Sequence, residues 1–137
     1  MIDSRTVVLA ACGVSAGVHV ALGPSHLEES RTLGVAFLLG ALLVTCAAAA
    51  IAFRPDAQWP AAVAAASFAA LLVSYVVFQH EPPDALAAIT KVVEATGLVF
   101  ALRLVRLRLG PLEPGVAGTV FALFVAFGLM LAGGAHG

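Results

Sequence analysis

Residues 17–31 read GVHVALGPSHLEESR and lie between two long apolar runs. This stretch contains two of the four histidines of the chain. Pro24 lacks the amide hydrogen that a helix interior requires, and Gly23 before it loosens the backbone. We therefore predict that a first helix ends near Leu22 and that the chain turns directly after it.

The residues that follow the proline have the pattern of a helix start. Ser25 is a favourable N-cap, and Glu28 three residues later completes a capping box. A second helix is therefore predicted to begin at about His26, after a very short turn. So short a turn makes the two helices antiparallel neighbours. His19 then lies at the depth of Glu28 and Glu29, and we predict that it approaches one of these carboxylates.

The composition of the chain argues against a water-soluble fold. Of its 137 residues, 61% are hydrophobic and 11% are charged. A soluble domain carries roughly 25% charged residues, whereas a membrane-spanning helix needs about 20 mostly apolar residues. Several runs of this chain meet that requirement. We therefore predict a single all-α domain, a polytopic transmembrane helical bundle that passes through the cell membrane several times.

Five membrane spans are predicted, and a bundle of four spans with a peripheral fifth helix is the alternative. Their ranges are 5–22, 26–53, 58–79, 85–109 and 116–132. The second range is longer than a bilayer requires. Its first turns are therefore expected to stand at the membrane interface, or the whole helix to tilt.

The basic residues predict the orientation of the bundle. With five spans, one end of the bundle collects Arg5, Arg54, Arg103, Arg106 and Arg108. Because lysine and arginine are enriched on the cytoplasmic side of a membrane, this end is predicted to face the cytoplasm. The N-terminus then lies inside and the C-terminus outside, and a cluster of histidines and carboxylates falls at the outer face.

This outer cluster is a candidate metal site. His26 and Glu29 are three residues apart and share a helix face. Together with His19 and His80 they offer nitrogen and oxygen ligands of the kind that Zn²⁺ and Cu²⁺ prefer. The alternative is that His26 is an interfacial residue at a helix end and that His19 bonds Ser15 or a backbone carbonyl. A haem is disfavoured, because a bis-histidine site needs a second deep histidine.

Lys91 and Glu94 are the only opposite charges well inside a predicted span. They are three residues apart, so we predict that Lys91 pairs with Glu94 or with a residue of the first hairpin. Ionisable residues inside a membrane mark functional sites, and one hypothesis is therefore proton or solute translocation through this pair and His19. The same intramembrane polar cluster is expected to include Ser15, Ser74, Tyr75 and Thr90.

The hypothesis that requires the least special chemistry is an accessory or assembly subunit. Gly13 and Gly17 form a small-residue pattern that allows close helix packing, either against a membrane-protein partner or in a homo-oligomer. Outward-facing metal binding or transport, and proton or solute translocation, are the alternatives. The sequence leans against an enzyme, because no motif indicates a reaction. The net charge of −1 gives no electrostatic basis for binding nucleic acid.

The segment VHVALGPSHLEES, followed by an apolar helix with Gly and Phe, resembles the first helical hairpin of small multi-span membrane proteins of actinobacteria. Those proteins often have a histidine followed by Pro-x-His-x-Glu at this place. The resemblance is confined to residues 1–40. It marks His19, Pro24, His26 and Glu28 as family-like positions and implies no particular activity.

Overall fold

The computed structural model describes residues 3–78 and 84–105, and within these ranges the chain forms helices and no strand. The helices are α1 (Ser4–Glu29), α2 (Arg31–Phe53), α3 (Trp59–Phe78) and α4 (Ala85–Leu104). Each is long and apolar enough to cross a membrane. The all-α class is confirmed. The predicted fifth span, 116–132, lies outside the described residues.

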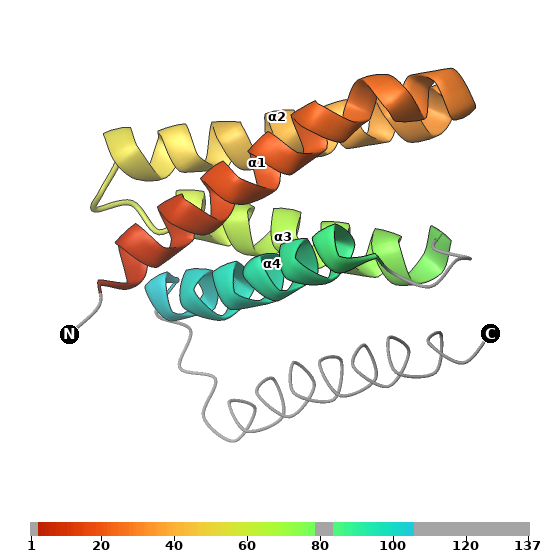
Figure 1. Cartoon of the computed structure of the whole chain (residues 1–137). Helices are drawn as coiled ribbons and strands as arrows, with labels where there is room; N and C mark the ends of the chain where they lie inside the picture. Colours follow the sequence, from red (N-terminus) through yellow and green to blue (C-terminus); the bar gives the residue numbers. More distant parts are fainter. Residues whose placement is uncertain (1–2, 79–83, 106–137) are drawn as a thin grey trace.

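The four helices pack in a ring in which each contacts two neighbours. Helix α1 packs against α2 and α4, and α3 packs against the other sides of α2 and α4. Consecutive helices run antiparallel, so the start of α1, the end of α2, the start of α3 and the end of α4 lie together at one end of the bundle (Figure 1). We call this the arginine end, because Arg5, Arg54 and Arg103 lie there.

The predicted boundary between the first two helices is wrong. Helix α1 runs through Pro24 and ends at Glu29. Ser25 is not an N-cap, because its Oγ donates to the carbonyl oxygen of Leu22 at 2.8 Å. A proline inside a helix removes one backbone hydrogen bond, whereas stopping the helix here would expose several backbone groups to an apolar environment. Continuing the helix is therefore the less costly choice.

The true turn between α1 and α2 is a single extended residue. Ser30 has φ −153° and ψ 117°, and its backbone N–H donates to the carbonyl oxygen of His26. Its Oγ accepts from the backbone N–H of Leu33, so it caps the start of α2. The predicted tight antiparallel connection is thus present, but it lies several residues later than expected. As a consequence, His26 and Glu29 belong to the end of α1.

Close approach of α1 and α2 depends on two glycines at this end of the bundle. A Cβ atom at Gly23 would lie 2.7 Å from Cδ2 of Leu38, and one at Gly34 would overlap the side chain and backbone of Leu27. Both glycines are buried. Gly13 and Gly17, the pair predicted to pack, have no described atom within 4 Å of such a Cβ atom and are exposed.

Candidate functional site

A buried carboxylate lies near the middle of α4. Glu94 is 0% exposed. Its Oε1 accepts a hydrogen bond from Oγ of Ser15 on α1 at 2.7 Å, and its Oε2 accepts one from Nζ of Lys91 at 2.6 Å. The predicted pairing of Lys91 with Glu94 is confirmed. Both oxygens of Glu94 therefore have a donor, and one of these donors carries the compensating positive charge.

His19 lies beside this carboxylate, one helical turn after Ser15. Its Nδ1 lies 2.8 Å from the backbone carbonyl oxygen of Ser15 and 3.9 Å from Oε1 of Glu94. Because a carbonyl oxygen only accepts, Nδ1 carries the hydrogen in this contact. In the neutral ring, Nε2 is then the free acceptor. The prediction that His19 approaches Glu28 or Glu29 is wrong, because α1 continues past Pro24 and carries those residues away.

Tyr75 of α3 completes the network from a third helix. Nζ of Lys91 lies 5.0 Å from the centroid of the Tyr75 ring, a cation–π contact. The other predicted members of the cluster stand apart: Thr90 is buried but donates to the carbonyl oxygen of Leu86 in its own helix, and Ser74 is exposed. We define the central network as His19, Ser15, Tyr75, Lys91 and Glu94.

An ionised pair inside an apolar bundle carries a large cost of desolvation. The side chain of Lys91 is 12% exposed and that of Glu94 is 0% exposed. Attraction between the two charges offsets this cost only where the remaining hydrogen-bonding positions are also filled. Ser15 fills one of them. The buried carboxylate of Glu94 is thus paired by donors from α1 and α4, and loss of Lys91 would leave it buried without a counter-charge.

A second polar pair lies where α1 ends. Nδ1 of His26 is 3.2 Å from Oε2 of Glu29, which confirms that these two residues share a helix face. The ring of Phe37 on α2 lies between the two histidines, with its centroid 4.4 Å from that of His26 and 5.0 Å from that of His19. His19 and His26 therefore both contact the ring of Phe37, and they do not converge on a common ligand position.

The predicted metal site does not assemble from the described residues. Within 3–78 and 84–105, no group of three or more His, Cys, Asp or Glu side chains is placed to hold a metal ion. His19 joins the central network, whereas His26 and Glu29 form a separate pair near the surface. His80, the fourth predicted ligand, lies outside the described residues.

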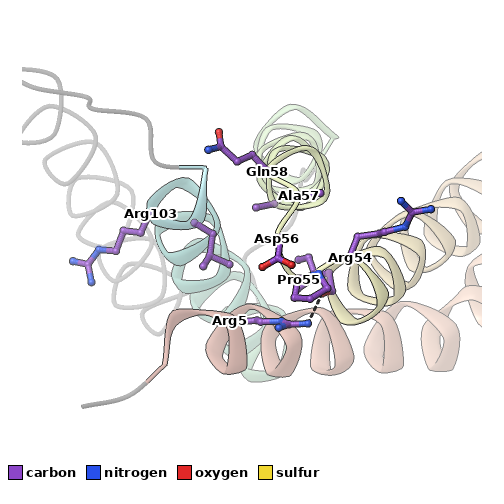
Figure 2. Close-up of a pocket in the computed structure, with 10 residues that line it drawn as sticks. Arg5, Arg54, Pro55, Asp56, Ala57, Gln58 and Arg103 are labelled. Atoms are coloured by element: carbon purple, nitrogen blue, oxygen red, sulfur yellow. Dashed lines mark hydrogen bonds between the residues drawn. The ribbon is translucent and has the colours of Figure 1, made fainter.

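The opposite end of the bundle has an open pocket of about 420 Å³ that is lined by residues of all four helices and of the α2–α3 loop. Nη2 of Arg5 donates to the carbonyl oxygens of Ile51 and Ala52 at 2.7 and 3.0 Å, so α1 caps the end of α2. Figure 2 shows that the guanidinium groups of Arg54 and Arg103 point away from each other. These arginines therefore do not converge on a common ligand.

No protein-family model matches the chain, and no curated protein or solved structure shows significant similarity to it.

Sequence reasoning named all five members of the central network and grouped them, but it also included Ser74 and Thr90 and expected His19 to contact Glu28 or Glu29. Lys91 and Glu94 were found because charges inside an apolar run are conspicuous. Phe37 was missed, since an aromatic residue in an apolar helix has no distinguishing signal. Its position seven residues after Ser30, the residue that caps α2, locates it only once the end of α1 is known.

Proposed function

We propose that this chain is a small integral membrane protein of the cell membrane that binds and releases protons at the central network. The main support for this proposal is the buried carboxylate of Glu94. It accepts hydrogen bonds from Ser15 and Lys91, and its Oε1 lies 3.9 Å from Nδ1 of His19. Four apolar helices of membrane-spanning length surround it. The charge distribution supports an orientation with the arginine end in the cytoplasm.

The chemistry of the central network suits proton exchange. Histidine gains and loses a proton near neutral pH, and ionisable side chains within membrane helices commonly serve proton relays. A proton added at Nε2 of His19 makes an imidazolium beside the carboxylate of Glu94. Lys91 holds the second oxygen of that carboxylate, so a change of charge at His19 alters the balance between the two cations. Protonation thus acts on contacts between α1 and α4.

The test is the pH dependence of thermal unfolding of the purified chain in lipid nanodiscs. His19→Asn keeps an amide donor near the place of Nδ1 but cannot titrate. We expect the Tm of the unmodified chain to depend on pH, because protonation of the network changes contacts between α1 and α4. We expect His19→Asn to reduce the pH dependence of the Tm. We expect Glu94→Gln to reduce it by a similar amount, because both residues belong to the same network.

A purely structural network gives a different result. If Ser15, Lys91 and Glu94 only hold the helices together, each substitution lowers Tm by the same amount at every pH. Parallel Tm curves for the unmodified chain, His19→Asn and Glu94→Gln would therefore overturn the proposal.

A second candidate function is an accessory subunit, and the exposed face of α1 supports it. Gly13 and Gly17 lie on this face with no described atom near them, and the neighbouring Val14 and Val20 are exposed. Small residues at such a spacing let another transmembrane helix approach closely. Cross-linking from a cysteine placed at Gly13, compared with one at the lipid-facing residue Val73, tests it. A product specific to position 13 supports a partner helix, and equal products contradict it.

A further inference from the structure

The two sides of the central network differ in how tightly they are closed. On the side toward the arginine end, Phe68 of α3 packs directly on Gly97 of α4. A Cβ atom at Gly97 would lie 2.6 Å from Cε2 of Phe68 and 2.8 Å from Cβ of Ala11. Phe68 is 0% exposed. Gly97 follows Glu94 by three residues and Ala11 precedes Ser15 by four, so this contact lies one turn from the network.

A hydrophobic cluster fills the core between the central network and the pocket at the arginine end. The buried core residues lie on the arginine side of the network in every helix: Val8, Ala11 and Cys12 on α1, Val44, Ala47 and Ile51 on α2, Ala64, Ala65 and Phe68 on α3, and Ala101 on α4. No histidine or carboxylate belongs to this cluster. A proton leaving Glu94 toward the arginine end would therefore meet several turns of packed hydrocarbon.

The other side of the network becomes more open step by step. Glu94 has a side chain that is 0% exposed, that of His19 is 7% exposed, that of His26 is 25% exposed and that of Glu29 is 69% exposed. These four residues lie in order from the centre of the bundle to the end of α1. Titratable groups therefore continue from the buried carboxylate to the surface on this side.

Helix α2 supplies the residues that border this path. A Cβ atom at Gly40 would lie 3.4 Å from Cδ2 and 3.8 Å from Nε2 of His19, so the free ring nitrogen faces a position without a side chain. Phe37, one turn earlier, contacts both His19 and His26. No titratable group of α2 faces His19. Among the described residues, the charged group beside His19 is Glu94 of α4, which also pairs with Lys91. Tyr75 of α3 lies against Lys91 on the far side of that pair.

We infer that the central network exchanges protons with one membrane face only, the face at which α1 ends, through His26 and past the ring of Phe37. This inference rests on the proposed proton-binding function and names its route. A proton from water adds to Nε2 of His19, and the proton on Nδ1 can then pass to Oε1 of Glu94, which leaves a neutral ring and a neutral carboxyl group. With the arginine end in the cytoplasm, the accessible face is the outer one.

Thiol labelling of two positions on α1 tests the route without depending on titration. Cys12 is buried on the arginine side of the network, and His19→Cys places a second thiol seven residues later on the path side. The lipid-exposed Cys46 is replaced by serine. Cells that produce the full chain are treated with a charged, membrane-impermeant methanethiosulfonate, intact or after permeabilisation, and labelling at each position is measured by peptide mass spectrometry.

We expect the thiol at position 19 to react in intact cells at least about tenfold faster than Cys12, because only a thiol that water reaches forms the reactive thiolate. Phe37→Ala should increase the rate at position 19, and Phe37→Leu should increase it less. Equal rates at both positions, no reaction at position 19, or reaction there only after permeabilisation would each overturn the route. Unchanged rates in both Phe37 variants would overturn the role of the aromatic ring.

A second measurement keeps His19 in place, so its result does not depend on whether the His19→Cys variant folds. We expect diethyl pyrocarbonate to modify the imidazole of His19 in the native chain, and the rate of this modification should rise in Phe37→Ala relative to the native chain. A rate that does not rise contradicts the role of Phe37. If labelling follows the expected pattern while the Tm curves remain parallel, the route exists and the proton-binding function is wrong. Failure of the one-sided route and failure of the proton-binding function therefore give different results.

Discussion

Oγ of Ser15 donates to Oε1 of Glu94 at 2.7 Å, across 79 positions of sequence. This bond joins the first described helix to the last one and closes the ring of four helices. It also fixes the rotation of α1, because His19 follows Ser15 by one turn on the same face. The same rotation of α1 that lets Ser15 reach Glu94 therefore also places His19 beside this carboxylate.

Removing the positive charge of the central network should strongly destabilise the fold. Lys91→Met leaves the carboxylate of Glu94 buried without its cation, and loss of one partner of a buried ion pair costs about 3–5 kcal/mol. The double variant Lys91→Met/Glu94→Gln removes both charges and should recover most of that loss. Unfolding free energies in mixed detergent micelles measure both effects. Equal stability of the single and double variants would contradict the pairing.

The contact between Phe68 and Gly97 predicts that a methyl group is not tolerated there. Gly97→Ala places a Cβ atom 2.6 Å from the Phe68 ring, and overpacking of this kind costs about 1–3 kcal/mol. Gly13→Ala is the matched control, because no described atom lies within 4 Å of a Cβ atom at that position and alanine favours a helix by about 1 kcal/mol over glycine. Gly97→Ala should lower the Tm and Gly13→Ala should raise it. The smaller side chain in Phe68→Leu should relieve part of the Gly97→Ala penalty.

Pro24 lies inside α1, so its replacement by alanine should strengthen the helix. Pro24→Ala restores the backbone N–H that a helix interior uses, and proline costs about 3 kcal/mol relative to alanine at such a position. We expect slower amide hydrogen exchange in the last two turns of α1 and a higher Tm. If a turn were present at Pro24, the same substitution would instead disturb the connection and lower the Tm. The direction of the change therefore separates the two arrangements.

The carboxylate of Asp3 should stabilise the start of α1 less in strong acid than at neutral pH. It caps α1, and the backbone N–H groups of Arg5 and Thr6 donate to its carboxylate, which lowers the pKa of Asp3 below its ordinary value of 3.8. A carboxylate with a lowered pKa stabilises the folded state above its ordinary pKa, and this contribution disappears as the pH falls through the lowered value. Asp3→Asn keeps a capping oxygen without titrating. Amide exchange of the first turn of α1 below pH 3.8 should rise in the native chain and stay level in Asp3→Asn.

Several helix boundaries could be predicted from the sequence, but the end of α1, the start of α2 and the end of α4 could not. Helix α4 ends at Leu104, five residues before the predicted 109. Phe53 ends α2 and Ala85 begins α4 as expected, because prolines and acidic residues in loops mark those positions. Pro24 carries the same local signal of a helix end, yet α1 continues through it. Local propensity is a weak guide inside an apolar bundle, where an interrupted helix leaves more backbone groups unsatisfied than a single missing N–H does.

The members of the central network and the Lys91–Glu94 pair could be predicted from the sequence, but the contact of His19 could not. Lys91 and Glu94 pair within one helix, and three-residue spacing alone predicts such a pair. The contact of His19 with Glu94 required the depth and rotation of α1 relative to α4. Those depend on where α1 ends and on the position of Ser15, neither of which the local pattern fixes.

By itself the sequence determined that the described chain forms long apolar helices and that arginines collect at one end, because hydrophobicity and charge are properties of the residues themselves. The tertiary structure alone decided which polar groups meet. Helix rotation and register follow from close packing at Gly23, Gly34 and Gly97, where the absence of a side chain lets a neighbouring helix approach. That packing places His19 beside Glu94, seals one side of the central network and leaves Phe37 between it and the surface.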